Sequence, residues 1–274
     1  APFATSGTYV YNIGINNTSH QRDDGKGGFV VEQYNGTTYA GDDITAYDGV
    51  TTVWSTVLTA DSHAFYANGE NLNVGGTPSG NIQANASMII GAYSSSGYDF
   101  VGEIEQLIIF GSALSDTDRK LIERYLGSTG VGLYSDIPDL STQALESLVA
   151  HYDGKMGVES DGGSVVSWTP VDGYGDSLDE MIVRSTQIGN GAPKLIKYGR
   201  PGKLIFDDTN VSADGRYLEG TLSNAESKEF TVFWLGHYKA EAPFATSGAY
   251  VYNIGINNTS HQRDDGKGGF VVEQ

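Results

Sequence analysis

The amino-acid sequence predicts an all-β fold of antiparallel strands with one short peripheral helix. Short runs of β-branched and aromatic residues recur along the chain, bounded by Gly, Asn or Asp. Glycine is abundant, with 37 residues, and only 18% of the residues are charged, which is typical of many short strands joined by turns. Because 39% of the 274 residues are hydrophobic and none is cysteine, we expect an ordinary core without disulfides or thiolate metal sites.

The expected strands are spread over most of the chain. In order they cover residues 8–13, 28–33, 53–58, 63–67, 87–91, 101–110, 165–168, 203–206, 216–220 and 230–235. The run at 63–67 leads into Asn68-Gly69, which favours a two-residue hairpin turn because both central residues of that turn need positive φ. Trp54, Trp168 and Trp234 lie within such runs, so we expect them to pack in the core.

One helix is predicted near 115–126. Ser115 is a suitable N-cap, Asp118 follows as in a capping box, and Leu114 stands where a hydrophobic staple belongs. An apolar stripe follows, formed by Leu121, Ile122 and Tyr125. Gly127 then offers a C-terminal stop. We expect this helix to lie against the outside of a sheet.

A long repeat organises the chain. Residues 1–33 recur as residues 242–274, an offset of 241, and differ only where Thr8 becomes Ala249. A match this close is not chance, and the period far exceeds the roughly 20–50 residues of solenoid repeats. The repeat therefore predicts a tandem array of whole domains, of which this chain holds one period and the start of the next. A duplicated segment or a circular permutant is the alternative.

The residues from Phe100 to Phe110 read FVGEIEQLIIF, and Ala113-Leu114-Ser115 and the helix follow. This succession resembles the closing segment of concanavalin A-like, laminin-G-like jelly-roll domains, which occur in tandem in large surface adhesins and fibres. Gln106 stands where that family usually carries Glu. The family's opening segment is similar to residues found later in the chain, at 148–153, 166–168, 206–207, 217–218 and 230–234. The resemblance implies an antiparallel jelly-roll sandwich whose parts appear in permuted order.

This order predicts the domain organisation. Residues 1–135 would be the C-terminal part of one module, 136–147 a linker, and 148–274 the N-terminal part of the next module. Each part alone would leave open sheet edges and an incomplete core. We therefore expect completion by neighbouring modules or copies of the chain, through exchange of strands or domains.

Charge restricts the function. The net charge is −18, which argues against nucleic-acid binding, since that needs a basic patch to displace counterions from phosphate. No stretch approaches the ~18–20 apolar residues of a membrane-spanning helix, so we expect no membrane insertion. We predict a structural or adhesive repeat module of a large extracellular or cell-surface protein, with a viral fibre or decoration protein on the virion surface as an alternative.

A catalytic role is the less favoured interpretation. Relatives with the jelly roll include glucanases, which place carboxylates at alternate positions of one strand. Glu103 and Glu105 are two residues apart, but no third acid follows, and the pair lies in the segment that resembles the closing strand. We predict no enzyme activity, no catalytic residue and no organic cofactor. The alternative is a carbohydrate-active enzyme or its glycan-binding accessory domain.

Calcium is the metal ion that the sequence most favours. Hard cations bind carboxylate and carbonyl oxygens in loops, and paired aspartates recur in loop-like stretches, at Asp23, Asp24, Asp42, Asp43, Asp207, Asp208, Asp264 and Asp265. The resemblance adds an expectation of calcium at the rim of the sandwich. No stretch has the spacing of an EF-hand loop, and each pair is also compatible with a simple turn.

Glycan binding is the second candidate. Tyr93, Tyr98 and Tyr174 lie in Gly- and Ser-rich stretches, where exposed rings can stack on sugars. We therefore predict them as the glycan-binding residues.

Overall fold

The structure is a computed structural model of the chain. It describes residues 19–23, 29–33, 38–41, 45–47, 49–59, 62–73, 86–90, 92–94, 97–99, 102–128, 139–171, 183–185, 194–196, 202–206, 218–222, 229–238, 254–256, 261–264 and 270–273.

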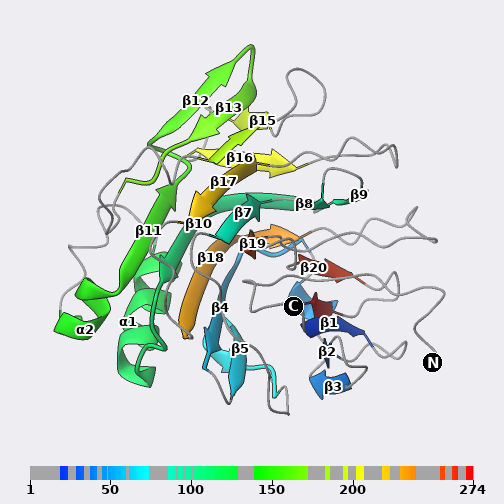
Figure 1. The fold of residues 1–274 in the computed structure, drawn as a ribbon, viewed down its shortest axis with the longest axis vertical. Coiled ribbons are helices and arrows are strands. Elements are labelled where there is room, and N and C mark those ends of the chain that lie inside the picture. The colour runs from blue at the N-terminus through cyan, green and yellow to red at the C-terminus, as the bar shows by residue number, and fades with distance from the viewer. Residues whose placement is uncertain are drawn as a thin grey trace.

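The described part of the chain is rich in strands and has few helices (Figure 1). The strands are β1 (Ser19–Asp23), β2 (Phe29–Gln33), β3 (Thr38–Gly41), β4 (Thr52–Leu58), β5 (His63–Ala67), β6 (Glu70–Asn71), β7 (Ala86–Ile90), β8 (Ala92–Ser94), β9 (Gly97–Asp99), β10 (Gly102–Phe110), β11 (Leu148–Asp153), β12 (Val158–Asp161), β13 (Ser164–Trp168), β14 (Val183–Ser185), β15 (Lys194–Ile196), β16 (Lys203–Phe206), β17 (Leu218–Leu222), β18 (Phe230–Tyr238), β19 (Ile254–Ile256), β20 (His261–Asp264) and β21 (Phe270–Glu273). The helices are η1 (Thr45–Tyr47), α1 (Asp116–Gly127) and α2 (Thr142–Glu146).

The main sheet contains 14 strands and joins both sides of the predicted linker. Its order is β19-β7-β17-β14-β13-β15-β16-β10-β18-β4-β5-β6, and β11 and β12 pair with β10 and β13. All of its pairings are antiparallel. A second sheet has five strands, β1-β2-β21-β20 with β3 on β2, and a third contains β8 and β9.

Strand β10 is the centre of the main sheet. One side pairs with β18 along its whole length, and the other pairs with β16 at its first residues and with β11 at its last ones. Seven of its nine residues are buried, and only Glu103 and Glu105 are partly exposed. A near-continuous apolar run suits a strand covered on both faces. The segment that resembles a closing strand therefore pairs, within one chain, with the segment that resembles an opening strand.

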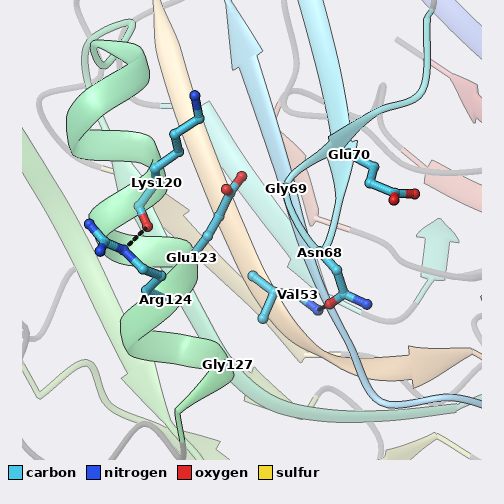
Figure 2. A pocket seen from close by; sticks show the side chains of 8 residues that line it. All are labelled: Val53, Asn68, Gly69, Glu70, Lys120, Glu123, Arg124 and Gly127. Atoms are coloured by element: carbon cyan, nitrogen blue, oxygen red, sulfur yellow. Dashed lines mark hydrogen bonds between the residues drawn. The ribbon is translucent and has the colours of Figure 1, made fainter.

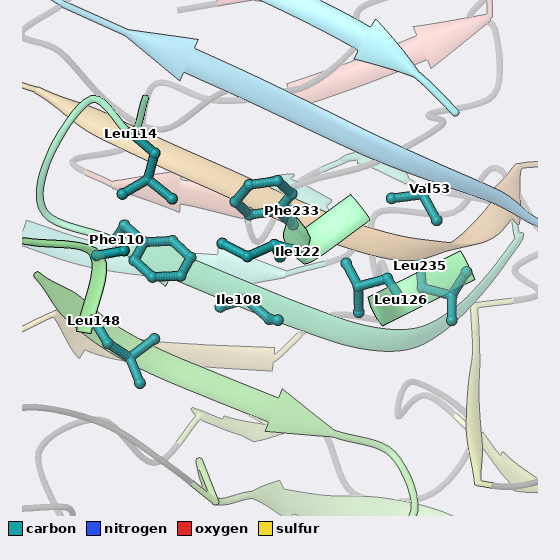
Figure 3. Close-up of a cluster of buried hydrophobic side chains, with 10 residues drawn as sticks. Val53, Ile108, Phe110, Leu114, Ile122, Leu126, Leu148, Phe233 and Leu235 are labelled. Atoms are coloured by element: carbon teal, nitrogen blue, oxygen red, sulfur yellow. The ribbon is translucent and has the colours of Figure 1, made fainter. Parts of the chain in front are cut away.

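The main hydrophobic cluster lies between this sheet and α1 (Figure 3). Ile108, Phe110, Phe233 and Leu235 face it from β10 and β18, and Ile122 faces it from α1. The cluster is completed by Val53, Leu114, Leu126, Ala144 and Leu148, with Leu121, Tyr125 and Leu140 partly buried against it. The rings of Phe110 and Phe233 meet edge to face, with centroids 5.8 Å apart. Burial of this apolar surface holds α1 on the sheet.

Two pairs of aromatic residues form ring contacts elsewhere in the core. Trp54 of β4 lies opposite Trp234 of β18, and their rings stack with centroids 5.5 Å apart. Tyr152 and Trp168 make a second ring contact, at 5.3 Å. All three tryptophans are at most 2% exposed, so the prediction that they pack in the core is confirmed.

The predicted helix is confirmed as α1. The hydroxyl of Ser115 accepts a hydrogen bond from the Asp118 backbone N–H at 3.1 Å and donates one to the Asp118 carboxylate at 2.7 Å. The same carboxylate accepts bonds from the N–H and hydroxyl of Ser141, both at 2.9 Å, and Ser141 is the N-cap of α2. One carboxylate thus joins the first turns of both helices. Gly127 belongs to the helix, and Ser128, with φ −88°, caps it.

The linker predicted at 136–147 contains packed structure. Leu140 packs against the hydrophobic cluster, and Ala144 of α2 is fully buried within it. Two serine hydroxyls, of Ser112 and Ser147, are joined by a hydrogen bond of 2.7 Å. The described residues of this segment therefore hold β11 close to the end of β10.

The two-residue turn at Asn68-Gly69 is also confirmed, since both residues have positive φ, 49° and 83°. No described helix is long and apolar enough to cross a membrane. The predicted strand at 8–13 lies outside the described residues. The other predicted strands appear within a few residues of their expected bounds, and the prediction of a strand-rich, mainly antiparallel fold is confirmed.

Candidate functional site

The 33-residue repeat forms the same hairpin twice. In the first copy β1 pairs with β2, and His20 lies opposite Glu32. In the second copy β20 pairs with β21, and His261 lies opposite Glu273. Every described pairing of the second hairpin equals one of the first plus 241 residues. The repeated sequence therefore specifies one register, and the structure repeats it.

The two hairpins contact each other through equivalent residues. Strand β2 pairs with β21 in parallel, and Val30 lies opposite Val271, Val31 opposite Val272 and Glu32 opposite Glu273. Each partner is the residue 241 positions later. The sheet order β1-β2-β21-β20 leaves equivalent strands, β1 and β20, at the two ends of this path. We call this parallel contact between β2 and β21 the repeat contact.

The second copy also contributes to the main sheet. Strand β19 pairs antiparallel with β7, where Ile254 lies opposite Ile90 and Ile256 opposite Met88. The other neighbour of β7 is β17. One end of the main sheet is thus formed by a strand that the sequence contains twice, because Ile13–Ile15 repeats Ile254–Ile256. The first copy of this strand lies outside the described residues.

A buried polar network lies beneath α1. Glu123 accepts a hydrogen bond from the Ser55 hydroxyl at 2.6 Å and one from Arg119 at 2.5 Å. Arg119 also bonds to Asp116, and its guanidinium lies 3.6 Å from the centre of the Tyr66 ring. Burial disfavours the charge of Arg119, but its two carboxylate partners outweigh burial and raise its pKa. Arg119 and Glu123 were not predicted as site residues, because their i, i+4 spacing signals an ion pair but not its burial.

An open pocket adjoins this network, between α1 and the β5–β6 hairpin (Figure 2). Its volume is about 680 Å³. It is lined by Val53, Asn68, Gly69, Glu70, Lys120, Glu123, Arg124 and Gly127. The Asn68 side chain accepts a hydrogen bond from the Val53 N–H at 2.9 Å, which fixes the hairpin tip beside β4. The lining mixes two acids with two bases, so the pocket has no strong preference for either sign of charge.

Glu103 and Glu105 form an ion-pair cluster with Lys203. The Lys203 ammonium lies 2.6 Å from a carboxylate oxygen of Glu103 and 3.0 Å from one of Glu105. His237 Nδ1 is 3.6 Å from Glu103. Burial disfavours the charged ammonium, but the two carboxylates outweigh this effect and raise the pKa of Lys203. A lysine shared between two carboxylates holds them in a structural pair across β10 and β16.

Asp153 is a buried carboxyl beside this cluster, only 1% exposed. One of its oxygens accepts a hydrogen bond from the Lys155 N–H at 2.8 Å, and the other has no hydrogen-bond partner among the described residues. Burial raises the pKa of Asp153, and nearby Glu105 adds to the rise. Its backbone carbonyl accepts a bond from the Trp168 indole at 3.0 Å. Asp153 is therefore a buried carboxyl with one oxygen that no described residue satisfies.

Two of the predicted glycan-binding tyrosines come together in the fold. Strands β8 and β9 pair antiparallel, with Ala92 opposite Asp99 and Ser94 opposite Gly97. This register places Tyr93 and Tyr98 at opposed positions of one hairpin. Tyr174 lies outside the described residues.

The structure describes few of the aspartates predicted for calcium. Asp23 ends β1 and Asp264 ends β20, at equivalent positions of the two hairpins. The others, Asp24, Asp42, Asp43, Asp207, Asp208 and Asp265, lie outside the described residues. Among the residues described, no three His, Asp or Glu side chains are grouped to hold a metal ion. Calcium binding stays a prediction.

Comparison with known proteins adds no relative. No protein-family model, curated protein or solved structure matches this chain. The likeness to jelly-roll domains therefore rests on the residues of the opening and closing segments alone.

Proposed function

We propose that this chain is a structural repeat module of an acidic extracellular or surface-attached array, and that its duplicated segment joins successive repeats. The observation that carries the proposal is the repeat contact, in which Val30, Val31 and Glu32 each pair with their own counterparts. A segment that pairs in register with its own copy can connect any number of identical units. An array needs such a contact, and an isolated enzyme does not.

The module itself is proposed to be a concanavalin A-like or laminin-G-like jelly roll. The central pairing of β10 with β11 and β18 supports this, because it joins the segments that resemble the family's closing and opening strands. Pairing of these two segments within one chain is expected of a circular permutant. It is equally expected of an array in which the two parts of each 241-residue period pair with each other. The duplicated segment favours the array, since a permutant needs only one copy.

A non-catalytic role is part of the proposal. Glu103 and Glu105 both form ion pairs with Lys203, which gives the two carboxylates a structural role on β10. A carbohydrate-active enzyme remains the alternative proposal, and a viral fibre is the alternative setting for the array. Hydrolysis of a panel of β-glucans that disappears in the E105Q variant would favour the enzyme.

The opposed positions of Tyr93 and Tyr98 favour a second function, glycan attachment by the β8–β9 hairpin. Paired aromatic residues on one hairpin suit the faces of sugar rings. A glycan array should show selective binding that is lost in Y93A/Y98A and kept in Y47A. Equal binding by all three proteins would contradict this function.

Self-association tests the main proposal. At high concentration the β2–β21 pairing that forms within one chain can form between two chains instead, so sedimentation velocity of the 274-residue chain should show association that increases with concentration. The V31E/V272E variant places two like charges in register and should lose that association, whereas V31E/V272K, with opposite charges, should recover it. The control V50E/V166E adds the same charge at two exposed valines outside the contact. A chain that stays monomeric at all concentrations would overturn the proposal.

A further inference from the structure

The end of the main sheet beside β7 holds one strand, yet the chain contains two segments whose sequence fits this position. Strand β7 has β17 on one side and β19 on the other, so a single position is filled by Ile254–Ile256. Ile13–Ile15 has the identical sequence, and the only difference between the two copies, Thr8 against Ala249, lies five residues before Ile13. The two copies therefore offer the same strand sequence to this position.

We propose that the β7 edge is an acceptor site for the repeated segment of a second copy of this chain, in which Ile13–Ile15 of one molecule replaces Ile254–Ile256 of its neighbour. This inference rests on the proposed array function and names the site through which neighbouring units interlock. An incoming strand makes the pairings already present, since Ile13 takes the position opposite Ile90 and Ile15 the position opposite Met88.

Strand β7 can pair with the repeated segment of its own chain or with that of a second chain. Because the two segments have the same sequence, the protein concentration decides between the two. The resident strand is tethered to its own module, which gives it an effective concentration in the millimolar range. A second molecule must reach comparable concentration or wait for the resident strand to be released. In an array the tethers are equivalent, because each repeated segment is attached to the module before it and to the module after it. The same segment can then complete either neighbour.

The sequence allows a clean test, because the chain has no cysteine. The acceptor is the full chain with Met88→Cys, whose own two copies are blocked by I13P/G14P and I254P/G255P. Adjacent residues of a strand direct their N–H groups to opposite sides, so each proline pair removes one hydrogen bond to β7. The donor is the full chain with Ile15→Cys. The matched control is the same donor with I13P/G14P added, which keeps the cysteine but cannot pair.

Mild oxidation of the acceptor with the donor should give a covalent heterodimer, mapped by peptide mass spectrometry to positions 88 and 15, with at least tenfold less product for the blocked donor. Equal yields from both donors, with all chains folded by circular dichroism, would overturn the inference. If the fully blocked acceptor does not fold, M88C/I254P/G255P replaces it, and the same comparison decides. Association lost in V31E/V272E but no cross-link at position 88 would leave the array function standing and reject this acceptor site. A specific cross-link between positions 88 and 15, without association of the unmodified chain, would support the acceptor site and reject the array function.

Discussion

Val31 lies opposite Val272 in a parallel ladder, and Val272 is the same residue of the repeat 241 positions later. Parallel in-register pairing is the arrangement in which identical strands bring every side chain next to its own counterpart. For apolar residues this is favourable, and for charged ones it is not. The repeat contact therefore places two pairs of valines, which we expect to stabilise it, beside one pair of glutamates, which we expect to weaken it.

The paired glutamates should weaken the repeat contact. Glu32 lies opposite Glu273, and like charges at opposed positions of a sheet cost about 0.2–1 kcal/mol. The E32Q/E273Q variant should slow amide hydrogen exchange at residues 29–33 and 270–273. Raising the salt concentration should also slow this exchange in the unmodified chain, because salt screens the repulsion between like charges. Exchange that is equally fast in this variant and in the control E146Q/E159Q would contradict the contact.

Gly154 and Gly202 should tolerate no side chain. A Cβ atom on Gly202 would lie 1.7 Å from the Gly154 carbonyl oxygen, and one on Gly154 would lie 2.2 Å from the Gly202 oxygen. Because backbone must move to relieve this overlap, G202A should lower the free energy of unfolding by at least about 2–3 kcal/mol. Chemical denaturation measures the loss. The control G127A, whose Cβ would meet nothing closer than 3.9 Å, should be neutral or slightly stabilising.

Asp153 should destabilise the fold above acidic pH. Burial raises its pKa in the folded chain, so the folded state binds the proton more tightly than the unfolded state does. Its contribution is therefore most favourable below the unfolded pKa of about 4 and is lost as the pH rises through the folded pKa. The D153N variant should be more stable than the unmodified chain at pH 7, by about 1–3 kcal/mol, and similar to it near pH 3.5. Thermal melts at both pH values check this; a variant that is less stable at pH 7 would show that the carboxylate is needed.

Removal of one partner of the Arg119–Glu123 ion pair should lower the free energy of unfolding strongly. Truncation of Glu123 leaves the buried Arg119 without its buried partner, so E123A should cost about 3–5 kcal/mol. The exposed pair of Lys120 with Asp116 is worth little, and K120A should change stability by less than about 0.5 kcal/mol. The double variant R119M/E123M should recover much of the loss, because it removes both charges together. Denaturant titrations of the three variants distinguish these outcomes.

The local elements were predictable from sequence because their signals are local. The caps of α1, the turn at Asn68-Gly69 and the apolar run of β10 each lie within one short window. The tie between Asp118 and Ser141 joins residues 23 positions apart, and no local pattern encodes it. The same holds for Lys203, which reaches Glu103 across 100 positions.

The sequence predicts the two copies of the repeat but not the contact between them. Comparison of residues 1–33 with 242–274 reveals two copies, and their hairpin register follows from the shared sequence. That β2 pairs in parallel with β21 depends on how the fold brings the two copies of the repeat together, which is a property of the whole chain. The jelly-roll likeness, the calcium ligands and the glycan-binding role of Tyr93, Tyr98 and Tyr174 stay predictions.

Spin labels at positions 31 and 272 measure directly whether β2 and β21 pair in register. Opposed residues of neighbouring strands lie about 5 Å apart, and labels that close exchange spins. The V31C/V272C chain, labelled at both cysteines, should give a continuous-wave spectrum collapsed toward a single broad line, whereas each singly labelled chain gives three resolved lines. Three resolved lines in the doubly labelled chain would show that the two copies do not pair in register, and would contradict the repeat contact as the link between successive units.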